Sequence, residues 1–531
     1  MFLAASEVHQ AESELLVLDH AKIGVERDLL AVEVHLGDDA RFRRPVADDL
    51  HHFGQLHEGV HDRPGVLAAR EDVDVLGRFA TAAEAAAQLG ANVACIEKEP
   101  ELGGTCLRVG CIPTKAWVQT AQFLHQANEV FGLLGVRVEQ PRLDFAAAND
   151  WKGRVSRQMT QGVASLFKTN GVEWVKGHGV LTDANTIAVA GGEDVRFKSA
   201  VIATGSFPLR PPIPGLESDL CVDSTGLLAQ TEVPRRLVIL GGGIIGSEFA
   251  SIFNRFGSEV TIIEMLDTLI PQEDADAAKE LAKAFGKRGI SLQLGKQCTG
   301  VEQRGNALNV WFGDGESVEC DLMLVSVGRG PLVEGIGLEA AGVAFDPRKG
   351  IETDERRRTS VGHIYAVGDC AGHWQLAHTA FREGEVAAEN ACGHDAAVNN
   401  RAVPRPIYTD PEVAGVGLTE AEAREQYGDD VAVGTFPWIA NARAVMQAET
   451  VGWVKSIHET RYGELLGIVM VGPHVTDLIE AGVVAIDAES TVETVADGMA
   501  AHPTLSEAVK EAGLVALGRA IHLPNRKRAT V

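Results

Sequence analysis

The segment that most constrains the fold is LVILGGGIIGSEFASIFNRFGSEVTIIE, residues 237–264. An apolar run leads directly into the pattern Gly-x-Gly-x-x-Gly, formed by Gly241, Gly243 and Gly246. A helical pattern follows, and a second apolar run ends at Glu264. Glycines allow a tight turn and a close approach of the backbone to a pyrophosphate, which rests on the helix N-terminus. The segment therefore predicts a dinucleotide-binding unit of a doubly wound α/β fold.

Glu264 also indicates which dinucleotide is bound. It follows the second strand, where a carboxylate accepts hydrogen bonds from the ribose hydroxyls. The same carboxylate would repel the extra phosphate of NADP. The sequence therefore predicts NAD rather than NADP at this unit.

A second copy of the unit lies upstream. LGANVACIE, residues 89–97, repeats the pattern of FGSEVTIIE, residues 256–264, and both end in glutamate. Counting back without gaps puts Asp74, Leu76 and Phe79 where the three glycines should be. A carboxylate and two bulky side chains are poor neighbours for a pyrophosphate. We therefore expect a first unit without its phosphate-binding loop.

Residues 1–79 differ in composition from the rest of the chain. None of the seven tryptophans or four tyrosines precedes residue 80. Histidines are crowded there instead but lack the compact spacing of metal ligands. We interpret the segment as foreign to residues 80–531, through a frameshift or a misplaced start. The histidines are His9, His20, His35, His51, His52, His57 and His61.

Composition limits the remaining possibilities. The 531 residues are too many for one core, so several domains are expected. A formal net charge of −26 argues against nucleic-acid binding. No basic signal region and no long uninterrupted apolar run is present, so we expect neither secretion nor a membrane span. Eight cysteines are too few for a disulfide scaffold and favour a reducing, cytoplasmic setting.

Two of those cysteines lie in GGTCLRVGCIPTK, residues 103–115. Cys106 and Cys111 are five positions apart, which does not fit the usual spacing of zinc ligands. Free cysteine is commonly a small buried hydrophobe. From the residues alone, the pair is either two inert core thiols or a functional dithiol.

These alternatives are decided by a resemblance to a known protein family, which seven sequence motifs carry. From about residue 82 onward the chain resembles the flavoprotein disulfide reductases, and most of all the dihydrolipoamide dehydrogenases. The resemblance implies an α/β fold with two Rossmann-like dinucleotide-binding domains and an α+β C-terminal dimerisation domain. It divides the chain into 1–79 (atypical), 80–216 (FAD, first part), 217–334 (NAD), 335–403 (FAD, central) and 404–531 (dimerisation). The motifs are EKEPELGGTCLRVGCIPTKA, VIATGS, LGGGIIGSE, HIYAVGDCAG, LAHTAFREG, YTDPEVAGVGLTE and AHPTLSEAVKEA.

The resemblance identifies Cys106 and Cys111 with the family's redox-active disulfide. Cys106 would meet the substrate dithiol, and Cys111 would lie against the flavin. Five residues of regular helix rise about 7.5 Å, whereas bridged cysteines have Cα atoms no more than roughly 7 Å apart. A bridge therefore requires a distorted turn, which Gly110 is suited to supply.

The remaining site residues are also implied by the resemblance. Lys115 would contact the flavin and pair with Glu248, and Glu97 would hold the adenosine ribose of FAD. Asp369, at the end of a strand, would bind the ribityl chain. The other expected cofactor contacts are Gly179, Thr204, Gly205, Ser206, Gly328, Leu376, Ala377 and His378.

The expected catalytic base is His502, oriented by Glu507 five positions later. In the family this pair reaches the disulfide of the other subunit, so a homodimer is implied. The expected reaction is oxidation of dihydrolipoamide, free or on a lipoyl domain, with FAD as cofactor and NAD+ as acceptor.

Two alternatives remain open. The chain could be another FAD-dependent reductase, acting on a different disulfide, a quinone or a metal, although no cysteine follows Cys392 to form a C-terminal relay. The missing first glycine loop favours the other alternative, an inactive relative without FAD.

Overall fold

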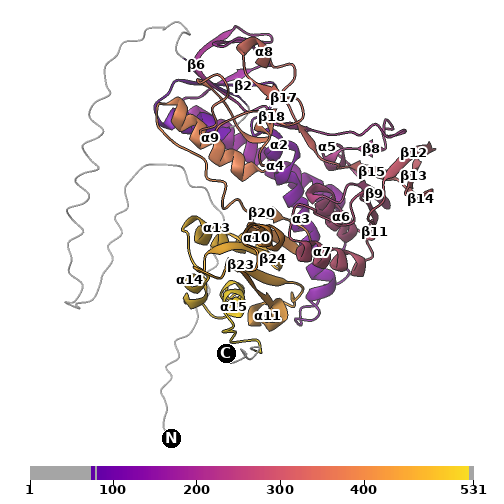
Figure 1. The fold of residues 1–531 in the computed structure, drawn as a ribbon. Coiled ribbons are helices and arrows are strands. Elements are labelled where there is room, and N and C mark those ends of the chain that lie inside the picture. The colour runs from indigo at the N-terminus through magenta and orange to yellow at the C-terminus, as the bar shows by residue number, and fades with distance from the viewer. Residues whose placement is uncertain (1–72, 78–79, 525–531) are drawn as a thin grey trace, which may run out of the picture. The chain divides into compact units, whose positions relative to one another are not determined.

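The computed structural model describes residues 73–77 and 80–524 (Figure 1). Its first sheet is mainly parallel and has the strand order β3-β2-β1-β6-β5-β4, with β19 also paired to β6. Its strands are β1 (Val73–Gly77), β2 (Val93–Glu97), β3 (Glu173–Lys176), β4 (Gly179–Asp183), β5 (Thr186–Val189), β6 (Val195–Ile202) and β19 (Ile364–Ala366).

Helices α1 (Ala80–Gln88) and α9 (Ala377–Ala391) pack against each other beside this sheet (Figure 1). The contact is close because Gly384 of α9 faces Ala82 of α1, and a Cβ on Gly384 would lie 3.3 Å from the Ala82 Cβ. The helices that follow β2 are α2 (Gly104–Val109), α3 (Cys111–His125), the π-helix η1 (Gln126–Val130) and α4 (Phe145–Asn170).

The second sheet is parallel, with the order β11-β10-β9-β15-β8. Its strands are β8 (Cys221–Val222), β9 (Arg236–Leu240), β10 (Glu259–Ile263), β11 (Ser291–Gln293) and β15 (Leu322–Val325). Its helices are α5 (Ser224–Leu228), α6 (Ile244–Phe256) and α7 (Ala275–Lys287). Smaller antiparallel pieces are β12 (Cys298–Arg304), β13 (Ala307–Phe312) and β14 (Glu316–Cys320), and the pair β7 (Ser206–Pro208) with β16 (Arg329–Pro331). The elements before β19 are α8 (Leu338–Ala341), β17 (Phe345–Asp346) and β18 (Gly350–Ile351).

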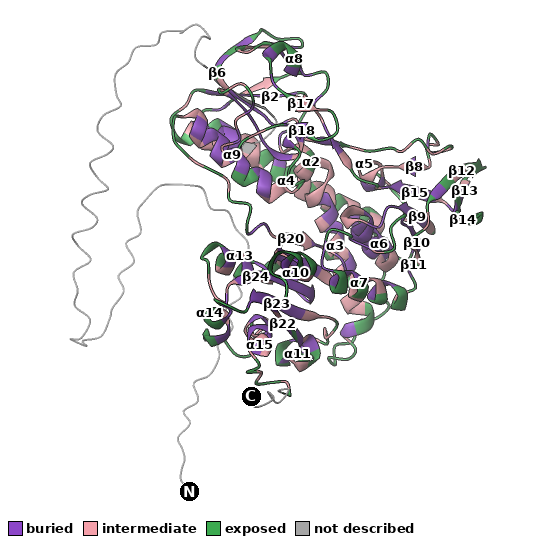
Figure 2. Ribbon diagram, in the orientation of Figure 1, coloured by how far each residue is buried: buried purple, intermediate pink, exposed green. Residues whose placement is uncertain are grey.

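The third sheet is antiparallel, with the order β20-β21-β24-β23-β22 and buried central strands β23 and β24 (Figure 2). Its strands are β20 (Arg405–Ile407), β21 (Glu412–Gly417), β22 (Val431–Pro437), β23 (Trp453–Glu459) and β24 (Leu465–Gly472). Its helices are α10 (Glu420–Tyr427), the 3-10 turn η3 (Trp438–Ala440), α11 (Ala442–Met446), α12 (Val475–Leu478), α13 (Glu480–Asp487), α14 (Val492–Asp497) and α15 (Glu507–Ala516). Two parallel sheets and an α+β unit confirm the predicted fold class.

The structure corrects the sequence prediction at the start of the first unit. Strand β1 begins at Val73 and pairs in parallel with both β2 and β6. Asp74 pairs with Val93 as Leu237 pairs with Val260 in the second unit. Asp74 and Leu76 are therefore strand residues and do not occupy a phosphate loop. The comparison without gaps failed because α1 has 9 residues whereas α6 has 13.

Phe79 and the histidines before residue 62 lie outside the described residues. Within the described ranges, no helix is long and apolar enough to cross a membrane. The same ranges contain no group of three or more His, Cys, Asp or Glu residues that could hold a metal ion.

Candidate active site

The cysteine pair lies at a break between two helices. Helix α2 ends at Val109 and α3 begins at Cys111, with Gly110 in a non-helical conformation between them. A Cβ on Gly110 would lie 2.8 Å from the carbonyl oxygen of Thr105, so only glycine fits. The predicted distorted turn at Gly110 is confirmed.

Both cysteines are free thiols in the structure, and they interact. The Cys106 thiol donates a hydrogen bond to the Cys111 sulfur, which raises the pKa of Cys106. The same bond, aided by the positive charge of Lys115, lowers the pKa of Cys111 to about 7. Near neutral pH the pair can therefore hold one thiol and one thiolate, with the negative charge on Cys111.

Lys115, one turn along α3 from Cys111, forms the expected ion pair with Glu248. Its Nζ lies 2.9 and 2.8 Å from the two carboxylate oxygens of Glu248, which is buried on α6. The Tyr408 backbone N–H donates to the same carboxylate at 2.9 Å, and Lys115 lies over the Tyr408 ring. Glu248, which belongs to the second dinucleotide unit, thereby holds Lys115 beside the cysteine pair.

A cavity of about 1670 Å³ brings most of the expected site residues together. It extends from the thiols to the second glycine loop. Of the described residues expected at the cofactors, Glu97, Gly179 and Gly246 do not line it. Those that line it are Cys106, Cys111, Lys115, Thr204, Gly205, Ser206, Gly241, Gly243, Glu248, Glu264, Gly328, Asp369, Leu376, Ala377 and His378.

The second glycine loop has the shape that its sequence predicts. Gly241 has a φ of +108°, and a Cβ there would lie 2.4 Å from the Ser326 carbonyl oxygen. A Cβ on Gly246 would lie 2.0 Å from the Gly241 carbonyl oxygen, so this glycine serves packing between helix and strand. A Cβ on Gly243, which precedes α6, would meet no atom within 4 Å. The open space beside Gly243, at the N-terminus of a long helix, fits a diphosphate.

The two glutamates at the ends of the second strands, Glu97 as the last residue of β2 and Glu264 directly after β10, are held in the same way. Glu97 accepts the Glu99 N–H at 3.0 Å, and Glu264 accepts the Leu266 N–H at 2.8 Å. Glu264 also accepts the Gly242 N–H at 2.7 Å and so fixes the glycine loop. Gly179 starts β4, where a Cβ would lie 3.0 Å from Ile187 and 3.2 Å from Ile96, so packing explains this glycine.

Asp369 lies in the 3-10 turn η2 (Gly368–Ala371) after β19, rather than in the strand as expected. Its carboxylate accepts a hydrogen bond from the Ser206 hydroxyl. Arg329 donates to the Ser206 hydroxyl oxygen at 2.7 Å and to its carbonyl oxygen at 2.9 Å. Burial lowers the pKa of Arg329.

Arg329 and Tyr408 are cavity residues that sequence reasoning missed. The sequence contained a signal for each, because Arg329 directly follows Gly328 and Tyr408 begins the quoted motif YTDPEVAGVGLTE. Leu376 and Ala377 lie at the start of α9. His378 follows them, with its Nε2 2.7 Å from the Pro404 carbonyl oxygen, and burial lowers its pKa.

His502 and Glu507 form the expected pair, with His502 Nδ1 2.9 Å from Glu507 Oε1. Glu507 begins α15 and also accepts the Thr504 backbone N–H at 2.9 Å. The His502 side chain is 68% exposed, and neither residue is among the described residues that line the large cavity. One chain therefore does not bring this pair to its own thiols.

The residues present fit a flavin beside the cysteine pair. The cavity places a low-pKa thiol, a lysine paired with a carboxylate and the Ser206–Asp369 pair on one connected surface. These groups supply a sulfur donor, a positive charge and a hydroxyl-binding carboxylate. Residues 78–79, which precede α1, lie outside the described residues.

Comparisons with known proteins agree with this geometry. Residues 80–384 match the family model of the pyridine nucleotide-disulphide oxidoreductases, and residues 403–513 match the dimerisation domain of the same family. The chain is 40% identical over 451 residues to a dihydrolipoyl dehydrogenase of Bacillus subtilis, covering 83% of this chain and 97% of that protein. It is 37% identical over 442 residues to a leghemoglobin reductase of Vigna unguiculata, covering 82% and 84%.

A solved structure with the same fold is the HOCl-induced flavoprotein disulfide reductase RclA from Escherichia coli. It has a TM-score of 0.76 and 28% identity, and the match covers 83% of this chain and 99% of that one. The matches to both family models, together with the thiol pair and the nucleotide loop, show that this chain belongs to the FAD-dependent pyridine nucleotide-disulphide oxidoreductases.

Proposed function

We propose that the chain is a dihydrolipoamide dehydrogenase, which oxidises dihydrolipoamide to lipoamide and reduces NAD+. The observation that carries the proposal is the placement of Cys106 and Cys111 at a helix break, beside the Lys115–Glu248 pair that favours a thiolate there. A dithiol substrate requires a disulfide whose departing sulfur is stable as a thiolate. The 40% identity to a dihydrolipoyl dehydrogenase supports this substrate class.

The first half of the reaction is thiol–disulfide exchange. A thiolate of the substrate attacks Cys106 Sγ of the oxidised pair, the Cys106–Cys111 bond breaks, and Cys111 leaves as a thiolate. The second substrate thiol then loses its proton and attacks the mixed disulfide, which releases lipoamide and the Cys106 sulfur. When bound, FAD supplies the two-electron chemistry that connects the thiol pair with the nicotinamide.

His502 of the partner subunit receives the substrate proton. The Glu507 carboxylate holds the imidazole through Nδ1, so Nε2 is free to act as the base. Burial raises the pKa of Glu507, but the Thr504 N–H and His502 together outweigh it and leave that pKa lowered. Glu507 therefore remains a carboxylate and stabilises the imidazolium that forms. The dimerisation domain and the high exposure of His502 support its contribution to the other subunit.

The proposed acceptor is NAD+ and the proposed partner is a lipoyl domain of a 2-oxo acid dehydrogenase complex. Glu264 supports NAD+, because its carboxylate lies at the glycine loop and would repel a 2′-phosphate. The proposed domain division is 1–79, 80–216, 217–334, 335–403 and 404–531. A cytoplasmic location fits this chemistry, since NAD+ and the complexes that carry lipoyl groups are available there.

The experiment that tests the proposal is a complementation of two defective subunits. Each of Cys106→Ser and His502→Ala alone should lose on the order of 10³-fold or more in turnover with dihydrolipoamide and NAD+. Mixed dimers should regain activity, because one of their two sites contains both wild-type residues. Flavin content and turnover with NADP+ are measured in parallel.

Three results would contradict the proposal. Near-normal turnover of His502→Ala would remove the proposed base. Inactive mixed dimers would refute a site shared between subunits. An unmodified protein that reduces a quinone or a metal ion but leaves dihydrolipoamide untouched would assign a different substrate.

A further inference from the structure

The second glycine loop rests on residues 269–274, a segment here called the strap. The Ile270 N–H donates to the Gly242 carbonyl oxygen at 2.9 Å. A Cβ on Gly242 would lie 2.8 Å from Leu269 Cδ2, so the loop and the strap are in close contact. Glu264 holds the N–H of the same glycine. A shift of the strap would therefore displace the middle of the nucleotide-binding turn.

The strap holds Ile270 in a conformation that its side chain disfavours. Ile270 has a φ of +39°, in the left-handed region that β-branched residues rarely adopt. Leu269 and Ile270 are both buried, and the Glu273 N–H donates to the Ile270 carbonyl oxygen at 3.0 Å. Such a conformation persists only where neighbouring contacts enforce it. The contacts that do so lie at the other end of the strap.

Arg405 provides the first of these contacts. Its Nε donates to both carboxylate oxygens of Glu273, at 3.1 and 3.2 Å, and its Nη1 donates to the Gly417 carbonyl oxygen at 3.0 Å. Both Arg405 and Glu273 are buried. Arg405 belongs to β20, so the antiparallel sheet holds one carboxylate of the strap.

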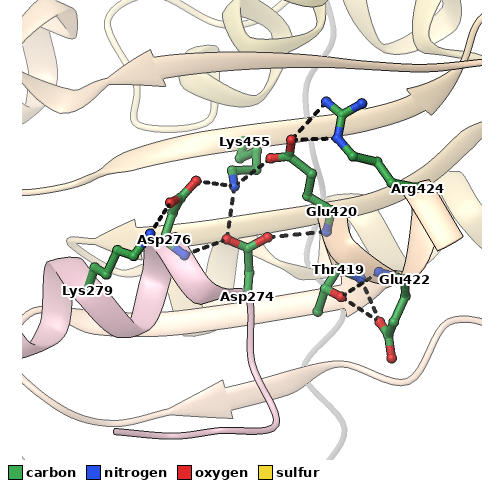
Figure 3. Close-up of polar contacts among 8 residues, drawn as sticks. All are labelled: Asp274, Asp276, Lys279, Thr419, Glu420, Glu422, Arg424 and Lys455. Carbon is green, nitrogen blue, oxygen red and sulfur yellow. Dashed lines mark hydrogen bonds and ion pairs between the residues drawn. The ribbon is translucent and has the colours of Figure 1, made fainter. Parts of the chain in front are cut away.

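Lys455 provides the second contact, shown in Figure 3. Its Nζ lies 2.9 Å from Asp274 Oδ1, 2.7 Å from Asp276 Oδ2 and 3.0 Å from Glu420 Oε2. Lys455 is on β23 and only 3% of its side chain is exposed. One buried ammonium group thus uses its three protons on three carboxylates.

Helix α10 completes this arrangement (Figure 3). A capping box formed by Thr419 and Glu422 starts the helix and orients its first residue, Glu420. The Glu420 N–H donates to Asp274 Oδ2 at 3.2 Å. Asp274 also caps α7 by accepting the Asp276 N–H. Both oxygens of Asp274 are therefore engaged, and the end of the strap is fixed.

Apart from Glu420, which lies in the dimerisation domain, the charges of the clamp divide between the two parts of the chain. The carboxylates Glu273, Asp274 and Asp276 belong to the nucleotide unit, whereas the cations Arg405 and Lys455 belong to the dimerisation domain. Removal of Lys455 would leave Asp274 buried without its cation, which is strongly unfavourable. The strap would then move to hydrate its carboxylates.

We propose that Lys455 and Arg405 are positioning residues for the nicotinamide nucleotide: they clamp the strap, and the strap sets the position of Gly242 in the glycine loop. Neither residue needs to contact the nucleotide itself. The dimerisation domain would thereby tune nucleotide affinity from a distance. This inference rests on the proposed placement of the nucleotide at Gly241, Gly243 and Gly246.

The test measures the Kd of NADH by fluorescence for the full chain and three variants. Lys455→Met should raise that Kd about tenfold, the size expected for coupling through a packed network. Asp276→Asn, at a half-exposed carboxylate, should raise it about twofold for the same reason. Arg424→Gln is the matched control, because among the described residues the Arg424 guanidinium donates to Glu420 Oε1 and not to the strap. It should leave the Kd unchanged.

A double-mutant cycle separates positioning from general loss of stability. In an Ile270→Gly background the strap no longer transmits a fixed position to Gly242, so Lys455→Met should have little further effect on the Kd. The Tm, and the rate at which dihydrolipoamide reduces the Cys106–Cys111 disulfide, should respond to Lys455→Met equally in both backgrounds. If Lys455→Met does not fold, Asp276→Asn takes its place in the cycle.

Two results would overturn the inference. A folded Lys455→Met protein with the parent Kd for NADH would show that the clamp does not position the loop. Full additivity with Ile270→Gly would show that the effect bypasses the strap. A parent chain that binds no NADH would instead refute the proposed nucleotide site itself, and the inference with it.

Discussion

The two dinucleotide units of this chain share a framework and differ at the turn that binds phosphate. In both, a five-residue strand pairs in parallel with a second strand, and a glutamate at the end of that strand accepts a backbone N–H two residues later. The second unit has a three-glycine turn and a helix α6 of 13 residues. The first has only residues 78–79 between β1 and α1, and α1 has 9 residues.

This difference separates two roles that glycine-rich loops usually combine. Strand pairing and the packing of α1 on α9 are retained in the first unit without the glycine pattern. The framework therefore depends on apolar burial and hydrogen bonding along the strands. In the second unit Gly243 leaves open space for a ligand, whereas Gly246 allows the helix to pack closely on the turn and strand.

The largest effect is expected from breaking the second unit. In Gly246→Val the new side chain would meet the Gly241 carbonyl oxygen, since an ideal Cβ lies 2.0 Å from it. We expect about 3 kcal/mol of lost stability and the loss of measurable NADH binding. Gly243→Ala is the matched control, because its Cβ meets no protein atom within 4 Å. It should weaken NADH binding with Tm unchanged, and equal Tm losses in the two variants would contradict this division of roles.

The next largest effect is expected from repairing the first unit. We would replace Arg78 and Phe79 by the residues 241–246 of the second unit, keeping strand β1 and the buried face of α1. Several new charge-assisted hydrogen bonds to the diphosphate should tighten FAD binding at least about tenfold. FAD per subunit after gel filtration is the measurement. Stoichiometric FAD in the unmodified chain would show that other residues already hold the phosphates.

Glu264→Ala tests the second unit at the position where the ribose of the nucleotide is expected to bind. The substitution leaves the Gly242 and Leu266 N–H groups without their acceptor and removes the charge that opposes a 2′-phosphate. We expect kcat/KM for NAD+ to fall about tenfold and the preference over NADP+ to narrow. Glu264→Gln is the control, since it keeps one acceptor oxygen and should keep more of the NAD+ activity. Equal use of both nucleotides by the parent would refute the proposed preference.

The smallest effect is expected from removing the negative charge of Glu248, which the second unit places near the thiols. The Glu248 carboxylate raises the pKa of Cys111, whereas Cys106 and Lys115 lower it to about 7 overall. Glu248→Gln should therefore lower this pKa further, so that the Cys111 thiolate persists to more acidic pH. The rate of Cys111 alkylation against pH, followed by mass spectrometry of the reduced protein, gives the midpoint. A midpoint that rises would show that Lys115 has lost its position.

Much of the site was predictable because its constraints are local. Gly241, Gly243 and Gly246 lie between two apolar runs, and Gly110 separates two cysteines that a regular helix would hold too far apart. The pairing of Lys115 with Glu248, 133 positions apart, followed only from the resemblance to a family. Arg329 was missed because its hydrogen-bond partner Ser206 lies 123 positions away in the sequence.

The start of the first unit shows where sequence reasoning ended. A comparison without gaps assigned Asp74 to a phosphate loop, but its pairing with Val93 makes it a strand residue. Local sequence could not reveal this register, because it depends on contacts with β2 and β6 and on a shortened helix.

By itself, the sequence determined the chemistry of this protein: two cysteines around a glycine, one intact nucleotide turn, and a histidine with its carboxylate five residues away. These features depend on the positions of glycines and on short spacings between reactive residues, and both can be read directly from a sequence. Only the tertiary structure decided how the parts are held together, from the register of β1 to the clamp of Arg405 and Lys455 on the strap. The clamp contacts join residues more than a hundred positions apart, and their geometry follows from the packing of whole sheets rather than from any local pattern.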